Sequence, residues 1–276
     1  MKNAFFGVCR NAVQKTKESR FRMVFFSLYL AYTLFSFVWF LRLGQARNAI
    51  LSVAYFALFM VVLPIFEYFM SMDCHAIFLV ILFSVPIGGI LGTCYDFYML
   101  IPFFDTLLHG ISGFIFAALG YAIMERILLK WDRQGRLACL LFAVAFSLAV
   151  AVLWEMFEWL LTATMNGDMQ EDSIVRDIHS YFMSGTHNKP LDILDIEKTV
   201  IIYDGGKSYI VSGGYMDLGL MDTLVDMLVC LIGSIVFLAI GAFDMIAKSN
   251  ILAHFVPYCT LKKNNDDNRS IDENNR

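Results

Sequence analysis

The sequence predicts an all-α membrane protein, a six-transmembrane-helix bundle with a small extracytoplasmic loop region that contains a β-hairpin. Three observations support this prediction. Of the 276 residues, 58% are hydrophobic and only 17% are charged, whereas soluble domains average about 45–50% apolar and about 25% charged residues. Six apolar stretches are long enough to cross a bilayer, which takes about 20 residues. Ionisable residues also recur inside three of these stretches.

Polar breaks define the limits of the predicted spans. The spans are 23–41, 48–69, 76–99, 103–124, 138–163 and 220–244. The transmembrane domain is therefore expected over 23–245, between a basic segment at 1–22 and a polar tail at 246–276. The first apolar stretch is long and has no small-residue cleavage site, so a secretory peptide is not expected. Residues 262–276 are rich in Asn and charge and should be disordered.

Lys and Arg near the span ends predict the orientation. They concentrate in the N-terminal segment, in the connection between the fourth and fifth spans, and in the tail. Six spans bring all three segments to one side, and the positive-inside rule makes that side cytoplasmic. Arg42 and Arg47 run against this bias, because they would lie outside. We therefore expect a multi-pass cell-membrane protein with cytoplasmic N and C termini.

The longest connection, 164–219, is then extracytoplasmic. It contains nine acidic and four basic residues. Two β-rich runs, 199–203 and 208–211, flank the turn sequence Asp204-Gly-Gly-Lys207, which is the pattern of a β-hairpin. The hairpin is either a surface feature that takes no part in a site or a lid over a site below it.

Composition and motifs exclude several classes of function. The net charge of −4 and the absence of a basic face with interleaved aromatics argue against nucleic-acid binding. The six cysteines form no Cys-x-x-Cys pair, and no nucleophile-elbow, zinc-protease or phosphate-loop motif occurs. The expected partners are the lipid bilayer and a lipid-linked or extracytoplasmic small molecule.

Three pairs of ionisable residues stand out, each on one face of a predicted span. They are Asp105 and His109 on the fourth span, Glu155 and Glu158 on the fifth, and Asp222 and Asp226 on the sixth. Such residues are costly in lipid and usually face a bundle interior or a watery cavity. With both termini inside, all three pairs lie at one depth near the outer surface. Small residues, among them Gly113 and Gly233, continue the same faces inward and allow close helix packing, so we expect one shared polar cluster.

Five carboxylates and one imidazole at one depth cannot all be ionised without protons or a metal ion. Carboxylate oxygens with an imidazole suit Mn²⁺, Fe²⁺, Zn²⁺ or Mg²⁺. One hypothesis is a metal-dependent intramembrane hydrolase or lipid-modifying enzyme, in which Glu155 is the general base. Its metal ligands would be Asp105, His109, Glu158, Asp222 and Asp226.

The leading interpretation is a structural or ligand- or ion-binding network that locks three helices together. The metal-dependent enzyme is the first alternative to it, and a proton relay in a proton-coupled transporter is the second. The inner halves of these spans are nearly all apolar, which disfavours a transport path.

Three segments resemble the YjdF-type family of uncharacterised bacterial inner-membrane proteins. They are Phe104-Asp-Thr-Leu-Leu-His-Gly110, Trp154-Glu-Met-Phe-Glu-Trp159 and Gly219-Leu-Met-Asp-Thr-Leu-Val-Asp-Met227 followed by Gly233. The resemblance implies that all six ionisable residues named above match polar positions of the family, and it implies no particular reaction. The outer loop departs from the family, which has a shorter, glycine-rich lead into the last helix. A looser likeness to VanZ-type membrane proteins hints at envelope or glycopeptide-related roles.

Overall fold

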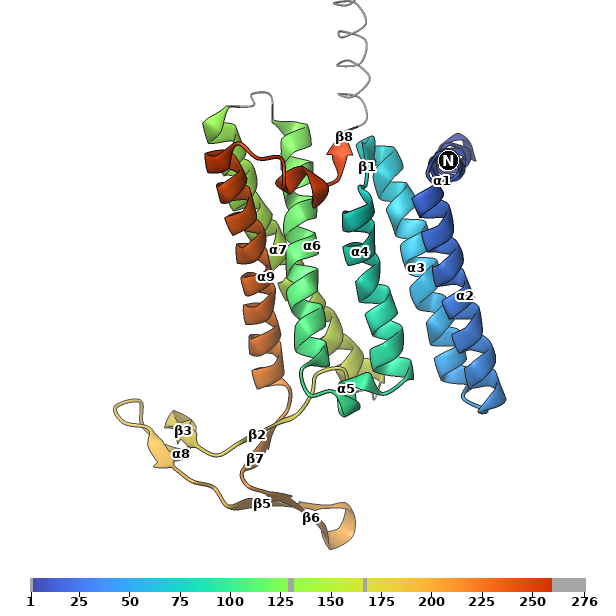
Figure 1. The fold of residues 1–276 in the computed structure, drawn as a ribbon. Helices are drawn as coiled ribbons and strands as arrows, with labels where there is room; N and C mark the ends of the chain where they lie inside the picture. The colour runs from blue at the N-terminus through green and yellow to red at the C-terminus, as the bar shows by residue number, and fades with distance from the viewer. Residues whose placement is uncertain (1, 129–131, 166–167, 260–276) are drawn as a thin grey trace, which may run out of the picture. The chain divides into compact units, whose positions relative to one another are not determined.

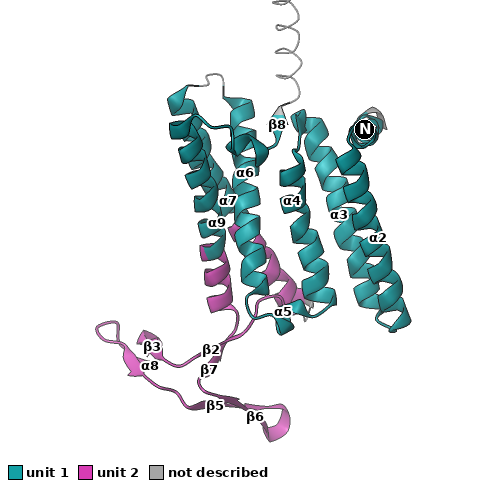
Figure 2. Cartoon of the chain, viewed as in Figure 1, with its two compact units in different colours: residues 1–150, 229–276 teal, residues 151–228 magenta. Residues whose placement is uncertain are grey.

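The chain folds into two compact units in the computed structural model, which describes residues 2–128, 132–165 and 168–259 (Figure 1). Unit 1 comprises residues 1–150 and 229–276, and unit 2 comprises residues 151–228 (Figure 2). The division crosses two continuous helices, α7 (Arg133–Met165) and α9 (Leu220–Ala247). The remaining long helices are α1 (Lys2–Glu18), α2 (Arg20–Arg42), α3 (Ala46–Met70), α4 (Ala76–Gly89) and α6 (Phe104–Ile127).

Six helices of the described chain are long and apolar enough to cross a membrane. They are Arg20–Arg42, Ala46–Met70, Ala76–Cys94, Phe104–Ile127, Arg133–Thr164 and Leu220–Ala247. The predicted fold class, a membrane protein with six apolar helices, is therefore confirmed, and most of the predicted limits fall within a few residues of the helix ends.

The third span is the one whose predicted end differs most. Its helix continues from α4 through a π-helical turn, η1 (Ile90–Cys94), and stops before the predicted end at residue 99. Asp96 has φ 60°, in the left-handed region, and the short helix α5 (Phe97–Leu100) follows it. A left-handed residue cannot continue a right-handed helix. Hydropathy could not reveal this break, because the residues after it are again apolar.

Aromatic packing fills the part of unit 1 formed by α2, α3 and α4. Phe83 of α4 is fully buried, and its ring contacts those of Phe25, Tyr29 and Phe59. Such edge-to-face and tilted arrangements are the favoured geometries of aromatic pairs. This packing fixes α4 against the first two spans.

Small residues bring α6 close to the parts of α7 and α9 that belong to unit 1. The Ser147 hydroxyl of α7 donates to the carbonyl oxygen of Gly113 at 2.8 Å. A Cβ placed at Gly120 would lie 2.8 Å from the Cβ of Phe146. Gly113 and Gly233 also face the α6–α9 contact, as the sequence pattern predicted.

The described residues of unit 2 form three antiparallel strand pairs. They are β2 (Ser173–Val175) with β7 (Tyr215–Asp217), β3 (Ile178–Ser180) with β4 (Leu191–Ile193), and β5 (Lys198–Tyr203) with β6 (Lys207–Ser212). The short helix α8 (Tyr181–Ser184) lies between β3 and β4, and the 3₁₀ turn η2 (Asp204–Gly206) joins β5 to β6. The β5–β6 pair is the predicted hairpin, and its turn uses positive φ angles at Asp204, Gly205 and Gly206.

The segments that flank the spans are more structured than their composition suggests. Most of the basic N-terminal segment forms α1, and Arg22, assigned to that segment from the sequence, belongs to α2. After α9, the chain forms a 3₁₀ turn, η3 (Leu252–His254), and β8 (Tyr258–Cys259). β8 pairs with β1 (Met72–Asp73), between α3 and α4. The expected disorder of 262–276 lies outside the described residues.

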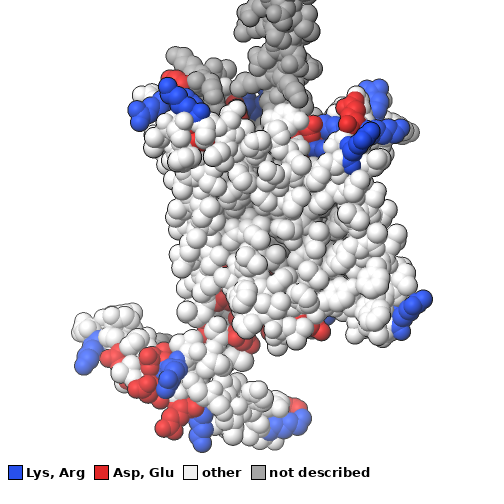
Figure 3. All heavy atoms as spheres, in the orientation of Figure 1, with Lys and Arg blue, Asp and Glu red and all other residues white. Residues whose placement is uncertain are grey.

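Lys and Arg side chains of unit 1 gather over α1 and beside the connection between α6 and α7 (Figure 3). These are two of the segments whose composition predicts a cytoplasmic location.

Candidate functional site

Two glycines bring the backbones of α6 and α9 into contact. A Cβ at Gly113 would lie 2.2 Å from the carbonyl oxygen of Cys230, and one at Gly233 would lie 2.0 Å from the carbonyl oxygen of Gly110. Both distances are shorter than any real Cβ contact, so only glycine permits this approach. The two helices therefore meet at a fixed separation and register.

His109 lies at this contact, in the second turn of α6. The Cys230 Sγ of α9 is 3.2 Å from the His109 carbonyl oxygen and 3.9 Å from its Nδ1. The imidazole therefore faces α9 rather than lipid. Asp105, one turn earlier on the same face of α6, has its Oδ2 3.6 Å from the His109 Nε2. Both residues lie in the first two turns of α6, and Figure 1 shows that α6 begins beside α5, at the end of unit 1 opposite α1.

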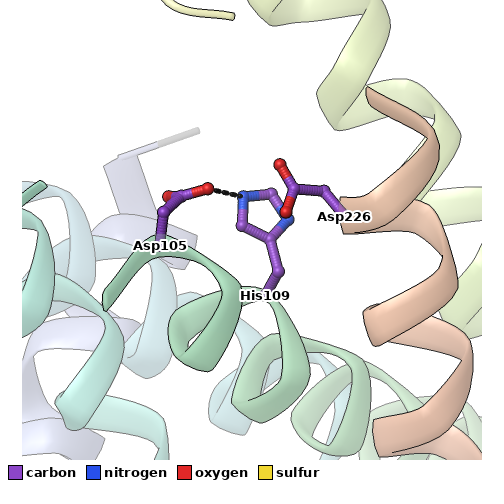
Figure 4. A group of neighbouring side chains, drawn as sticks. All are labelled: Asp105, His109 and Asp226. Atoms are coloured by element: carbon purple, nitrogen blue, oxygen red, sulfur yellow. Dashed lines mark ion pairs between the residues drawn. The ribbon is translucent and has the colours of Figure 1, made fainter. Parts of the chain in front are cut away.

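Asp226 completes the group, since it precedes Cys230 by one turn on α9. One ligand atom each from Asp105, His109 and Asp226 can be chosen so that all lie within 4.8 Å of one another. Figure 4 shows the carboxylates of Asp105 and Asp226 both directed toward the imidazole of His109. The side chain of Asp105 is 26% exposed and that of His109 12%, whereas Asp226 is only 2% exposed.

The donor set fits a divalent cation. Two carboxylates and one imidazole are ligands that zinc, manganese and iron accept. Two carboxylates close together disfavour each other's ionised form, and a bound cation or a proton relieves this repulsion. Three protein ligands also match catalytic zinc sites, where a further coordination position is left for water or substrate.

The other predicted site residues are also accounted for. Glu155 and Glu158 of α7 are 5% and 7% exposed, and a carboxylate oxygen of Glu158 accepts a hydrogen bond from Trp154 Nε1 at 2.8 Å. The Asp222 carboxylate of α9 accepts from the backbone N–H of Glu171 at 3.0 Å. Among the described residues, the group that could hold a metal includes none of these three. Their roles as base and ligands stay predictions.

A second polar cluster, which we call the Arg22–Glu67 network, escaped the sequence reasoning. It consists of Lys15, Arg22, Glu67 and Asp73. The Arg22 guanidinium donates to both oxygens of Glu67, at 2.6 and 3.2 Å, and also to Asp73. The Lys15 ammonium lies 3.4 Å from Glu67 and 3.7 Å from Asp73. One signal could have revealed it, because Arg22 begins one apolar stretch and Glu67 ends the next, which puts opposite charges at one depth.

The C-terminal segment joins this network through Tyr258. Its hydroxyl donates to Asp73 at 3.2 Å, and residues 258 and 73 are register partners in the β1–β8 pair. Burial, with the charge and the hydrogen bond of Asp73, raises the pKa of Tyr258 to about 12. The network therefore ties the segment after α9 to the connection between α3 and α4.

Comparison with known proteins agrees with the motif resemblance. The family model described as "Predicted membrane protein (DUF2238)" matches residues 21–246. The match extends from the first turn of α2 to the last turn of α9 and includes Asp105, His109 and Asp226. No curated protein and no solved structure matches the chain. The likeness to VanZ-type proteins gains no support from these comparisons. The chain belongs to the DUF2238 family of predicted membrane proteins, which is the YjdF-type family that its motifs resemble.

Proposed function

We propose that this membrane protein binds a divalent metal ion where α6 meets α9, with Asp105, His109 and Asp226 as protein ligands. The observation that carries the proposal is the convergence of two carboxylates and one imidazole within 4.8 Å. The Gly113 and Gly233 contacts support it further, because they hold α6 and α9 in one register. A preorganised donor set is what a metal site requires.

The imidazole indicates which ions to test first. Ca²⁺ and Mg²⁺ prefer oxygen ligands, and Mg²⁺ usually keeps several waters. Zn²⁺, Mn²⁺ and Fe²⁺ accept a mixed nitrogen and oxygen set. The nearby Cys230 thiol, 3.9 Å from the His109 Nδ1, adds a soft donor. We therefore expect Zn²⁺ to bind more tightly than Mg²⁺.

The reaction class that best suits such a site is hydrolysis or modification of a lipid-linked or extracytoplasmic small molecule. A bound ion supplies Lewis-acid chemistry and a water of lowered pKa. Glu155 is our candidate general base for two reasons. Its carboxylate is buried, and it lies in the segment Trp154-Glu-Met-Phe-Glu-Trp159, one of the three segments that resemble the family. Retention of activity by Glu155→Gln would remove it from that role.

We also propose that the site faces the extracytoplasmic side of a cell membrane. The Lys and Arg bias supports this, since Asp105 and His109 belong to the start of α6, and α6 begins at the end of unit 1 opposite the basic helix α1. Reporter fusions at the C terminus and within the β5–β6 hairpin test the orientation. Only the C-terminal reporter should respond as cytoplasmic.

Metal analysis of the purified full-length protein tests the site directly. The protein, stripped with chelator and equilibrated with Zn²⁺ or Mn²⁺, should retain about one ion per chain and gain thermal stability on binding. Asp226→Asn and His109→Gln should lose most of the bound metal. Asp222→Asn is the matched control, because it removes an acid one turn away on α9 and should retain the ion.

The same measurement separates the proposal from a purely structural network. Equal metal content in the parent protein and in Asp226→Asn, or melting temperatures that no metal or chelator alters, would show that the three residues only lock the helices together. Loss of metal in Asp222→Asn, with retention in Asp226→Asn, would contradict the ligand set.

A further inference from the structure

Helix α1 packs one face against the rest of unit 1 and leaves the opposite face uncovered. The half-buried face repeats every three to four residues, as a helix face does. Its members include Ala4, Gly7, Val8, Asn11, Ala12, Lys15 and Thr16. A Cβ at Gly7 would lie 2.4 Å from the Tyr68 hydroxyl oxygen, and the Lys15 ammonium donates to the carbonyl oxygen of Met72 at 2.5 Å. These contacts fix α1 to the end of α3, and with it the direction of its outer face.

The outer face combines an apolar stripe with basic residues. Phe5 and Phe6 are 67% and 68% exposed, Val13 is 53% exposed, and Cys9 lies between them. The exposed side chains of Arg10 and Lys17 follow directly beside the stripe, and with Phe6 and Val13 they line a shallow surface groove. Two exposed phenylalanines on one helix face are unfavourable in water. A basic helix with an aromatic stripe is typical of segments that lie in a membrane surface.

α1 lies at the end of the candidate spans, which is the level at which a membrane surface is expected. The helix ends at Glu18, and after a single residue, Ser19, the candidate span α2 begins. Figure 1 shows α1 end-on while α2 and α3 run lengthwise, so α1 crosses the end of the spans. A helix at that level and in that direction lies where lipid headgroups end and acyl chains begin.

We propose that α1 is a membrane-surface helix that recognises anionic lipid. The stripe of Phe5, Phe6, Cys9 and Val13 enters the boundary between headgroups and acyl chains, and Arg10 and Lys17 bind anionic headgroups. The occupant of the uncovered face is therefore the leaflet in which the protein itself resides. Charge complementarity selects an anionic leaflet over a zwitterionic one.

A fluorophore on Cys9 tests whether the stripe is in lipid. Four other cysteines, Cys74, Cys94, Cys139 and Cys230, are buried, and the substitution Cys259→Ser removes the sixth. The full-length protein is placed, one chain per disc, in lipid nanodiscs of phosphatidylglycerol or phosphatidylcholine. Aqueous iodide should quench the label on Cys9 several-fold less than the same label on Gln14→Cys, introduced with Cys9→Ser. Gln14 is exposed on the polar edge of the same helix.

Two further double variants test the two parts of the proposal. The first tests whether the apolar stripe, rather than the dye itself, causes insertion into lipid, and the second tests whether the basic residues recognise anionic headgroups. Phe5→Ser with Phe6→Ser should raise quenching at Cys9 toward the Gln14→Cys level. Arg10→Gln with Lys17→Gln should reduce the protection in phosphatidylglycerol discs and leave phosphatidylcholine discs unchanged. Equal quenching at positions 9 and 14 in both lipids would overturn the surface helix. Protection that is equal in both lipids and indifferent to the charge variant would overturn the recognition of anionic lipid.

Discussion

The two polar clusters of the bundle differ in charge balance. The Arg22–Glu67 network sets two cations, Lys15 and Arg22, against two carboxylates, and every ion is within 4.0 Å of an opposite charge. The group of Asp105, His109 and Asp226 has two carboxylates and a single imidazole. The first cluster pairs two cations with two carboxylates, whereas the second contains one more carboxylate than imidazole. Charge balance, rather than burial alone, therefore separates a structural cluster from a candidate binding site.

The largest effect on stability is expected from a substitution that breaks the Arg22–Glu67 network. Arg22→Met leaves Glu67, which is 2% exposed, without its bidentate partner. Removing one member of a buried pair typically costs about 3–5 kcal/mol. Thermal unfolding of the purified protein should show a large drop in melting temperature. Arg42→Gln is the control, because Arg42 is an exposed arginine at the other end of the same helix.

A double variant sharpens the interpretation of that loss. Arg22→Met combined with Glu67→Leu replaces the pair by apolar groups and should recover much of the lost stability, since Lys15 still faces Asp73 at 3.7 Å. Failure of the double variant to recover would indicate that the network does more than hold the helices together.

An intermediate effect is expected where α6 and α9 touch. Gly233→Ala puts a Cβ against the Gly110 carbonyl oxygen, which is backbone and cannot rotate away. Overpacking of this kind costs about 1–3 kcal/mol, and the shift of α9 should also lower metal affinity. Gly241→Ala on the same helix is the control, because its Cβ would meet the flexible Leu140 side chain. Equal metal affinity in both variants would argue against a site that depends on helix register.

A smaller effect is expected at Tyr258. Tyr258→Phe removes the hydrogen bond to Asp73, worth about 1 kcal/mol. Because the folded-state pKa of Tyr258 is raised from 10.0 to about 12, its hydroxyl group stabilises the fold at neutral pH, and this contribution is lost as the pH rises from about 10 through about 12. Melting temperatures measured between pH 8 and 11, at about one-unit steps, should fall less steeply in the variant. An identical pH profile would rule out this linkage.

The smallest expected effect tests the charge argument itself. In metal-free protein, Asp226→Asn should leave the melting temperature unchanged or raise it slightly, because it removes one like charge from an acid-rich group. Glu67→Gln, in the Arg22–Glu67 network, should lower the melting temperature. A fall of the same size in both variants would mean that the two clusters do not differ in the way their charges suggest.

Part of the architecture follows from the chain alone. The number of spans and the β5–β6 hairpin could be predicted, because apolar length and turn residues are local properties. The glycines at the α6–α9 contact were predicted for the same reason, since small residues at helical spacing mark a close interface. The structure of α1 was missed, because its apolar stripe is short and interrupted by Lys and Arg, so its composition is that of a polar segment.

The sequence by itself determined which ionisable residues lie in the apolar spans and which of them share a helix face. Only the tertiary structure decided that Asp105, His109 and Asp226 form one group of potential ligands, and that Arg22 meets Glu67 across two helices. The physical reason is that helical periodicity fixes which residues of a helix share a face. It does not fix the rotation of that face toward a neighbour or the register of contact, which the packing of Gly113 and Gly233 against backbone sets.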